Sequence, residues 1–155
     1  MSIITDLPTD ESNISVEKLS ILLANTYTLY LKTQNYHWNV VDPYFSDLHA
    51  LFEKQYTELA ESVDEIAERI RTLGAKSPGT FAEFLTLKTL DEAKTNLTGQ
   101  EMLKNLSNDH QAIIHSLRTY IKDLQDSSDE GTKDFFIGRL KAHEKLSWII
   151  QSHFR

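Results

Sequence analysis

Two pairs of side chains in the first half of the sequence have the chemistry and the spacing of metal ligands. His49 and Glu53 are four residues apart, and Asp64 and Glu68 repeat that spacing further along. Residues four apart lie on the same face of a helix, so each pair could chelate a cation. The chain contains no cysteine, so imidazole and carboxylate groups are its strong ligands. A solvated helix face is the alternative, because such spacing also arises by chance among 23 acidic residues.

His37 is a further candidate ligand, at the end of the helix that precedes this stretch. It lies between Tyr36 and Trp38, and a lone histidine in such a position is more often structural than functional. The other histidines have no carboxylate or second histidine at a comparable spacing, and we expect each of them at the surface or at the edge of the core. They are His110, His115, His143 and His153.

The distance between the two pairs limits how they could form one site. His49 and Asp64 are 15 residues apart on what the pattern predicts to be one unbroken helix. At about 1.5 Å per residue this separation is roughly 22 Å, too far for both residues to bind one ion within a single chain. Two antiparallel copies of the helix, related by a two-fold axis, would bring His49 of one copy to Asp64 and Glu68 of the other. A site built from both pairs therefore requires an oligomer.

Apolar residues at three- and four-residue steps predict the helices that must position these side chains. Four long helices are expected at residues 14–39, 44–73, 99–124 and 132–153, after a polar, acidic arm at 1–13. Thr80 with Glu83 forms a capping box for a short helix that ends at Leu87, and Thr98 with Glu101 forms another at the start of the third long helix. No stretch alternates at period two for long enough to indicate a strand.

Single residues mark the other helix ends. The expected N-caps are Asn13 or Ser15, Asp42 before Pro43, and Thr132, and Gly74 is expected to end the second helix. We therefore predict an all-α fold, in which residues 14–155 form a four-helix bundle with a short extra helix in the long crossover between helices 2 and 3.

The composition is that of a soluble protein with one domain. The chain has 155 residues, of which 40% are hydrophobic and 25% charged. Its net charge of −7 and pI of about 5.3 predict electrostatic repulsion of nucleic acid and of anionic membranes. No apolar run is long enough to span a membrane, and the N-terminus lacks the features of a signal peptide. A cytoplasmic location is expected.

The residues around the candidate ligands closely resemble those of the Dps family, the ferritin-like mini-ferritins of starved or peroxide-stressed bacteria. The matching residues are Tyr36-His37-Trp38-Asn39-Val40, Phe45, Leu48-His49, Phe52 and Asp64-Glu65-Ile66-Ala67-Glu68-Arg69-Ile70. The resemblance extends over nearly the whole chain and implies a ferritin-like bundle that assembles into a hollow dodecamer. It also implies di-iron sites at two-fold interfaces, with His37 and His49 from one subunit, Asp64 and Glu68 from its partner, and Glu53 as a further ligand.

The resemblance implies an activity as well. Fe(II) would be oxidised to Fe(III), with hydrogen peroxide as the usual oxidant and dioxygen as the other, and Fe(III) would be stored in the shell. Trp38 would intercept stray oxidising equivalents or would simply be a packing aromatic. Glu130 and Asp134 would line an acidic pore for iron or would belong to a solvated acidic loop. Larger ferritins bind iron inside each bundle with Glu-x-x-His pairs, and no glutamate lies three residues before any histidine here, which favours an interface site.

Many Dps proteins coat DNA through a lysine-rich N-terminal arm, and this sequence departs from that pattern. Residues 1–17 contain four acidic side chains and neither lysine nor arginine. We therefore expect no appreciable DNA binding at physiological salt and neutral pH. The rival functions are a nucleoid-compacting DNA-binding protein with little ferroxidase activity and a purely structural helical module.

Overall fold

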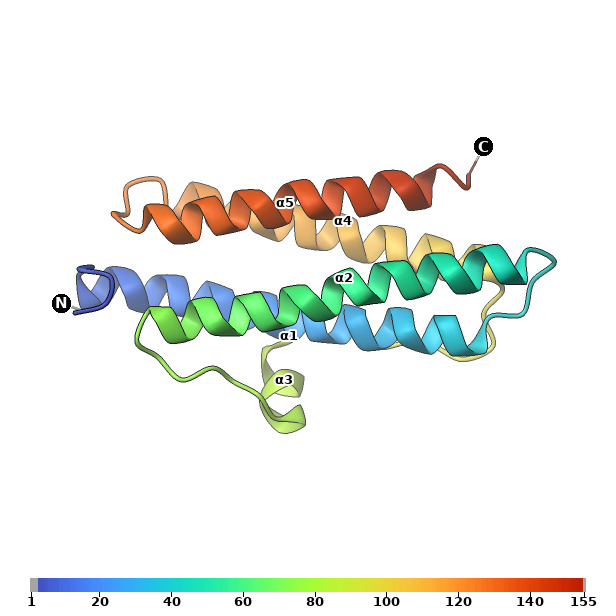
Figure 1. Ribbon diagram of the computed structural model, residues 1–155, viewed down its shortest axis with the longest axis horizontal. Coiled ribbons are helices and arrows are strands. Elements are labelled where there is room, and N and C mark those ends of the chain that lie inside the picture. Colours follow the sequence, from blue (N-terminus) through green and yellow to red (C-terminus); the bar gives the residue numbers. More distant parts are fainter. Residues whose placement is uncertain (1–2, 155) are drawn as a thin grey trace.

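The structure, a computed structural model, describes residues 3–154 and contains five helices and no strand among them (Figure 1). They are α1 (Thr9–Asn39), α2 (Phe45–Thr72), α3 (Phe81–Leu87), α4 (Gly99–Asp123) and α5 (Glu130–Gln151). α1 packs along α2, α4 packs along α5, and the two hairpins form an elongated four-helix bundle. α3 lies in the crossover between α2 and α4 and packs against α1 from outside the bundle. The predicted all-α fold is confirmed; residues 1, 2 and 155 of the predicted arm and domain lie outside the described residues.

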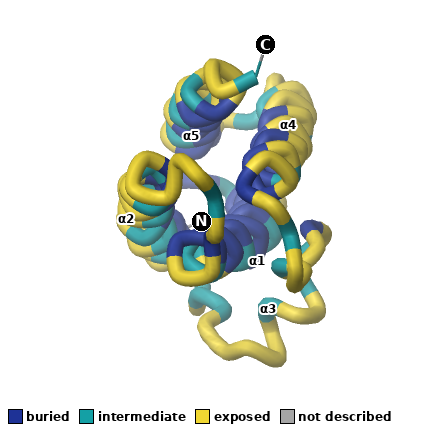
Figure 2. The backbone as a smooth tube through the Cα atoms, turned by 90° about the vertical axis from the view of Figure 1, so that its right-hand side faces the viewer, coloured by how far each residue is buried: buried dark blue, intermediate teal, exposed yellow. Residues whose placement is uncertain are grey.

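Apolar side chains from all four long helices face the axis of the bundle, where Figure 2 shows the buried residues in dark blue. α2 illustrates how the helical period produces this face: its fully buried apolar residues are Phe52, Leu59, Ile66 and Ile70. Burying a side chain of this size contributes about 1.5–3 kcal/mol. The opposite face of α2 exposes Asp64 and Glu68, so one amphipathic helix both fills the core and presents candidate ligands. None of the helices between residues 3 and 154 is long and apolar enough to cross a membrane.

Three helix ends agree with the sequence analysis. Thr98 and Glu101 form the full capping box at the start of α4, with N···O distances of 3.0 Å and 3.1 Å. At the start of α3 the Thr80 hydroxyl accepts from the Glu83 N–H at 3.2 Å, as predicted, and the Glu83 carboxylate accepts from the Gly79 N–H at 3.2 Å and from the Thr80 hydroxyl at 2.9 Å, so this end is a variant of the predicted capping box. Gly74, which follows α2, has a φ of +91°, a conformation that strongly favours glycine.

Three other helix starts differ from the prediction. α1 begins at Thr9, five residues early, because the carbonyl of Pro8 accepts from Ser12 N at 3.1 Å, and neither Asn13 nor Ser15 caps it. Part of the predicted arm is therefore helical. α2 begins at Phe45 without a side-chain cap. α5 begins at Glu130 because Asp129, and not Thr132, is the cap, with its carboxylate accepting from Thr132 N at 3.0 Å. A carboxylate at a helix N-terminus also interacts favourably with the helix dipole.

A buried asparagine on α1 fixes the long crossover to the bundle. The side-chain oxygen of Asn25 accepts from the backbone N–H groups of Thr89 and Leu90, at 2.8 Å and 3.1 Å, and its amide donates to the Thr89 hydroxyl. Lys32, two turns further along α1, donates to the carbonyl of Asp91 at 3.1 Å. These bonds satisfy backbone groups of the segment after α3, which lets the crossover pass along α1 on its way to α4.

Candidate metal centre

The end of α1 and the start of α2 bring His37 and His49 into direct contact. Nδ1 of His37 lies 2.7 Å from the backbone oxygen of His49, and Nδ1 of His49 lies 2.7 Å from the backbone oxygen of His37. The two rings stack, with their centroids 3.7 Å apart and their planes 13° apart. The two histidines therefore hold each other in place across the α1–α2 turn.

These reciprocal hydrogen bonds determine which nitrogen of each ring carries the proton. A carbonyl oxygen only accepts, so Nδ1 of each ring must donate, and in the neutral ring Nε2 then carries the lone pair. A second hydrogen bond of this kind is the usual way in which a protein orients a metal-binding imidazole. Both Nε2 atoms thus keep a lone pair that a cation could accept.

Aromatic side chains flank the two imidazoles. The ring of Phe45 stacks on His49 with centroids 4.9 Å apart, and the ring of Tyr56 packs edge-on against His37 at 5.3 Å. In the preceding turn, Asp42 accepts from the backbone N–H of Tyr44 at 2.8 Å. Asp42 was predicted to be the N-cap of α2, with Pro43 as the first helical residue; instead the Asp42 side chain closes the turn just before the helix. The packing of Phe45 and Tyr56 against the two imidazoles restricts the rotation of the His37 and His49 rings.

The second predicted pair lies four turns further along α2. The side chains of Asp64 and Glu68 are exposed, and a hydrogen bond between them, together with the charge of Asp64, raises the pKa of the Glu68 carboxyl. The two groups are therefore close enough to share a proton, and a cation could neutralise them in its place. Glu53, one turn after His49, is also exposed on α2.

One chain contains two halves of a possible site and not a whole one. α2 is continuous from Phe45 to Thr72. All residues between His49 and Asp64 are therefore helical, and at about 1.5 Å per residue the two lie roughly 22 Å apart along α2. Within residues 3–154 there is no group of three or more histidine, aspartate or glutamate side chains that could hold a metal ion. The structure joins His37 to His49 and Asp64 to Glu68, and it does not join the two pairs.

The expectation for two of the other histidines was wrong. His110 and His143 are both fully buried, and their Nδ1 atoms lie 2.9 Å apart between α4 and α5. Burial, assisted by the charge of Arg139, lowers the pKa of His110 to about 3, and burial also holds the pKa of His143 well below its ordinary value. His115 and His153 are exposed, as expected.

A signal for this buried pair was present in the sequence. His110 continues the buried face of α4 at three- and four-residue steps, and His143 does the same on α5. These faces comprise Leu103, Leu106, His110, Ile113 and Leu117 on α4, and Phe136, His143, Leu146 and Ile150 on α5. Ligand spacing does not reveal either residue, because each lies among apolar residues on its helix face and finds its partner 33 residues away.

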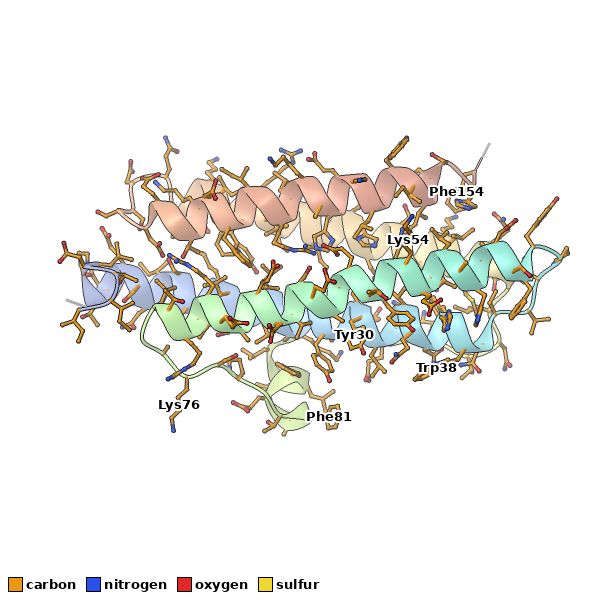
Figure 3. The ribbon with its side chains drawn as sticks, in the orientation of Figure 1. Tyr30, Trp38, Lys54, Lys76, Phe81 and Phe154 are labelled. Carbon is orange, nitrogen blue, oxygen red and sulfur yellow. The ribbon has the colours of Figure 1, made fainter. Side chains whose placement is uncertain are left out.

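The remaining residues named from the sequence lie at the surface. Trp38 is 61% exposed and, as Figure 3 shows, lies on the outer side of α1, away from α4 and α5. Glu130 and Asp134 are exposed at the start of α5, at the opposite end of the bundle from the α1–α2 turn with His37 and His49. Glu130 pairs with Lys133 at 2.6 Å.

Comparison with known proteins shows which family the chain resembles. Residues 16–155 match the family model for the ferritin-like domain. A low-temperature-induced protein of Nostoc sp. is 42% identical over 132 residues, which are 84% of this chain and 74% of the relative. DNA protection during starvation protein 2 of Bacillus anthracis is 34% identical over 137 residues, 88% of this chain and 94% of the relative.

A solved structure of the same family has the same fold. Dps from Vibrio cholerae O1, described as one of the ferritin-like diiron-carboxylate proteins, superposes with a TM-score of 0.93. The two chains are 30% identical, and the match covers 100% of this chain and 99% of the other.

Proposed function

We infer that this chain, which belongs to the Dps family of ferritin-like proteins, oxidises Fe(II) and stores the Fe(III) product. The observation that carries the proposal is a pair of half-sites, one at the α1–α2 turn and the other further along the continuous helix α2. His37 and His49 provide two imidazole lone pairs, whereas Asp64 and Glu68 provide two adjacent carboxyl groups. Imidazole nitrogen with carboxylate oxygen is a ligand set that suits Fe(II).

The two half-sites would become complete sites in a two-fold dimer. When two copies of α2 lie antiparallel, His37 and His49 of one copy approach Asp64 and Glu68 of the partner subunit. The same axis creates a second, equivalent site, so each dimer holds two. Glu53, one turn from His49, is placed to supply a further oxygen ligand.

The chemistry follows from the ligands, with Fe(II) as the substrate. An incomplete protein ligand set leaves positions at the bound Fe(II) for the oxidant and for water. With hydrogen peroxide, two Fe(II) ions give one electron each, the O–O bond breaks, and two protons complete two molecules of water. Peroxide is then reduced by two electrons together, which avoids the hydroxyl radical, and this would protect the cell. A hollow dodecamer would keep the Fe(III) as an oxide.

The central test removes both imidazoles from the site. In a variant with His37→Ala and His49→Ala, we expect the initial rate of peroxide-dependent Fe(II) oxidation to fall at least about tenfold, because the ligands are lost. Stopped-flow absorbance of the Fe(III) product measures the rate. The matched control is His115→Ala with His153→Ala, which removes two exposed histidines elsewhere.

Assembly must be measured on the same samples by analytical ultracentrifugation, so that loss of ligands is distinguished from loss of the dimer. Equal rates in the double variant and the control, in assemblies of equal size, would reject the proposed site. Dioxygen in place of peroxide, in a parallel series, identifies the preferred oxidant.

The rival function, nucleoid compaction, requires DNA binding. Asp10 and Glu11 lie in the first turn of α1, and Glu11 accepts from the backbone N–H of Ser128 at 3.0 Å, so the start of the chain presents acidic groups on an ordered helix. We expect the purified assembly to leave duplex DNA unshifted in a gel at physiological salt, because phosphate and these carboxylates repel each other. A tight complex that dissociates as salt is raised would favour the rival.

A further inference from the structure

A chain of four polar side chains crosses the core of the bundle from α2 to α4. Glu58 on α2 pairs with Arg139 on α5, and Nη2 of Arg139 lies 3.1 Å from Nε2 of His143. Nδ1 of His143 lies 2.9 Å from Nδ1 of His110 on α4. Arg139 is 6% exposed and both histidines are fully buried, so water at the surface does not reach the far end of this chain.

The chemistry of arginine gives the chain a direction. A guanidinium group only donates, so Nε2 of His143 must accept and carry a lone pair. The neutral ring of His143 then has its proton on Nδ1, which donates to Nδ1 of His110. His110 in turn has its proton on Nε2. A charged imidazole in either position would place a second buried cation beside Arg139, so both rings are neutral.

This series of hydrogen-bonded side chains ends at a donor, Nε2 of His110, that has no partner among the described protein groups. Nε2 of His110 has no hydrogen-bond partner within residues 3–154, although the side chain is completely buried. Buried N–H groups are nearly always paired with protein or with ordered water, because leaving one unpaired costs free energy. Something beyond the side chains is therefore expected at this nitrogen.

A buried acceptor in the same layer of the core also lacks a partner. Gln55 on α2 is 2% exposed, and across the described part of the chain no group bonds to its Oε1. Its Nε2 donates to the carbonyl of Leu146 at 3.3 Å, which fixes the orientation of the amide. Leu146 follows His143 by three residues, less than one turn, so Gln55 on α2 and His110 on α4 contact the same stretch of α5.

We propose that this layer of the core is a binding site for one water molecule, which accepts from Nε2 of His110 and donates to Oε1 of Gln55. Water is the smallest ligand that offers both an acceptor and a donor, and buried waters typically bridge polar groups of this kind. The site differs in kind from a metal site inside a helical bundle, because its ligand is neutral and forms hydrogen bonds.

The same hydrogen bonds exclude a divalent cation. A metal ion at Nε2 of His110 would need the lone pair there, which would move the proton of that ring to Nδ1. His143 would then have to be protonated on Nε2, and two N–H groups would face each other between His143 and Arg139. An anion is excluded as well, because Oε1 of Gln55 only accepts.

Magic-angle-spinning NMR on the intact assembly, labelled with ¹⁵N-histidine, tests the proposal without disturbing the fold. We expect Nε2 of His110 and Nδ1 of His143 to be protonated, and we expect transfer of magnetisation from water to the His110 Nε2–H. Addition of Zn(II) should leave the shifts of these two rings unchanged. An unprotonated Nε2 at His110, no transfer from water, or a shift of that nitrogen on adding Zn(II) would each overturn the proposal.

A pair of matched variants locates the water. Gln55→Met removes the acceptor at similar size, and the transfer to His110 should then fall several-fold because the water loses one of its two partners. Gln111→Met is the control, since Gln111 on α4 bonds to Ser147 outside the chain of four residues. Undiminished transfer in Gln55→Met would show that Gln55 does not hold the ligand and would contradict the proposed site.

Discussion

His37 with His49 and His110 with His143 are both pairs of contacting imidazoles between helices, yet the groups around them differ. The first pair lies at the end of the α1–α2 hairpin, and each Nδ1 donates to a backbone carbonyl of the other residue. The second pair lies in the core, where the guanidinium of Arg139 donates to one ring and that ring donates to the other. The first arrangement leaves two lone pairs free, whereas the second uses both in hydrogen bonds.

The difference shows that the partner of one ring nitrogen decides what the other nitrogen can do. A carbonyl acceptor on Nδ1 leaves the lone pair of Nε2 free for a cation, whereas an arginine donor makes the histidine part of a hydrogen-bonded core. The type of residue is the same in both cases. Substitutions that affect one pair should therefore change metal binding, and those that affect the other should change stability.

The largest expected effect is the loss of stability when the core pair is broken. His143→Ala leaves a cavity and removes the acceptor of Arg139, and we expect the free energy of unfolding to fall by about 3 kcal/mol or more. His37→Ala should cost about 1 kcal/mol, because it removes one partly accessible hydrogen bond, from Nδ1 of His37 to the carbonyl of His49, whereas the backbone carbonyl of residue 37 still accepts from His49. Denaturant unfolding with matched oligomeric state measures both values. Equal losses would contradict the larger contribution of the core pair to stability.

The second-largest expected effect is a loss of stability in acid, which acts through the core pair His110 and His143. Folding holds the pKa of His110 at about 3, and that of His143 well below its ordinary value, whereas both titrate near 6.5 when the chain is unfolded. Below pH 6.5 the unfolded chain therefore binds protons that the folded chain does not. The free energy of unfolding should decrease as pH falls, by roughly 1.4 kcal/mol per pH unit for each histidine, and this loss should be absent above pH 6.5.

Denaturant unfolding at several pH values between 5 and 7.5 follows this dependence. A variant with His110→Phe and His143→Leu should lose most of the slope, even if its stability at pH 7.5 is lower. The variant with His115→Ala and His153→Ala should keep it. A wild-type curve that is flat across this range would mean that the pair is not held neutral.

The smallest effect concerns the side chains that orient the candidate ligands His37 and His49. Tyr56→Leu removes the ring that packs against His37, and we expect affinity for Zn(II), used as a probe of the site, to fall about tenfold. Stability should change little. Tyr44→Leu is the control, because Tyr44 is 70% exposed in the preceding turn. Calorimetric titration that gave equal affinities for the two variants would show that ring orientation does not limit binding.

The sequence predicts the fold well because most of the fold depends on local patterns. The apolar period of α2 and the Thr98 capping box identified their elements closely, and both depend on residues within a few turns. The start of α1 was missed because the helix begins after Pro8 with no side-chain cap, so no capping signal exists to be found. The start of α5 was missed because both Asp129 and Thr132 are good caps, and the choice depends on tertiary contacts such as the ion pair of Asp129 with Arg69.

The candidate site could be predicted only in part. Spacing on α2 identified Asp64 with Glu68, and helix length showed that His49 lies too far away to join them in one chain. The contact of His37 with His49 depends on the geometry of the α1–α2 turn, which spacing alone does not specify. The core pair depends on the packing of α4 against α5 and on Arg139, so its role became visible only in three dimensions.

The continuity of α2 has a consequence for when the chemistry can begin. Because α2 keeps His49 roughly 22 Å from Asp64, a newly made subunit holds two separate halves of the proposed site and no complete one. On the proposed function, such a subunit is inert towards iron while it is alone and gains activity when it meets its copy. Fe(III), which is insoluble, would then form only where a container already exists to receive it.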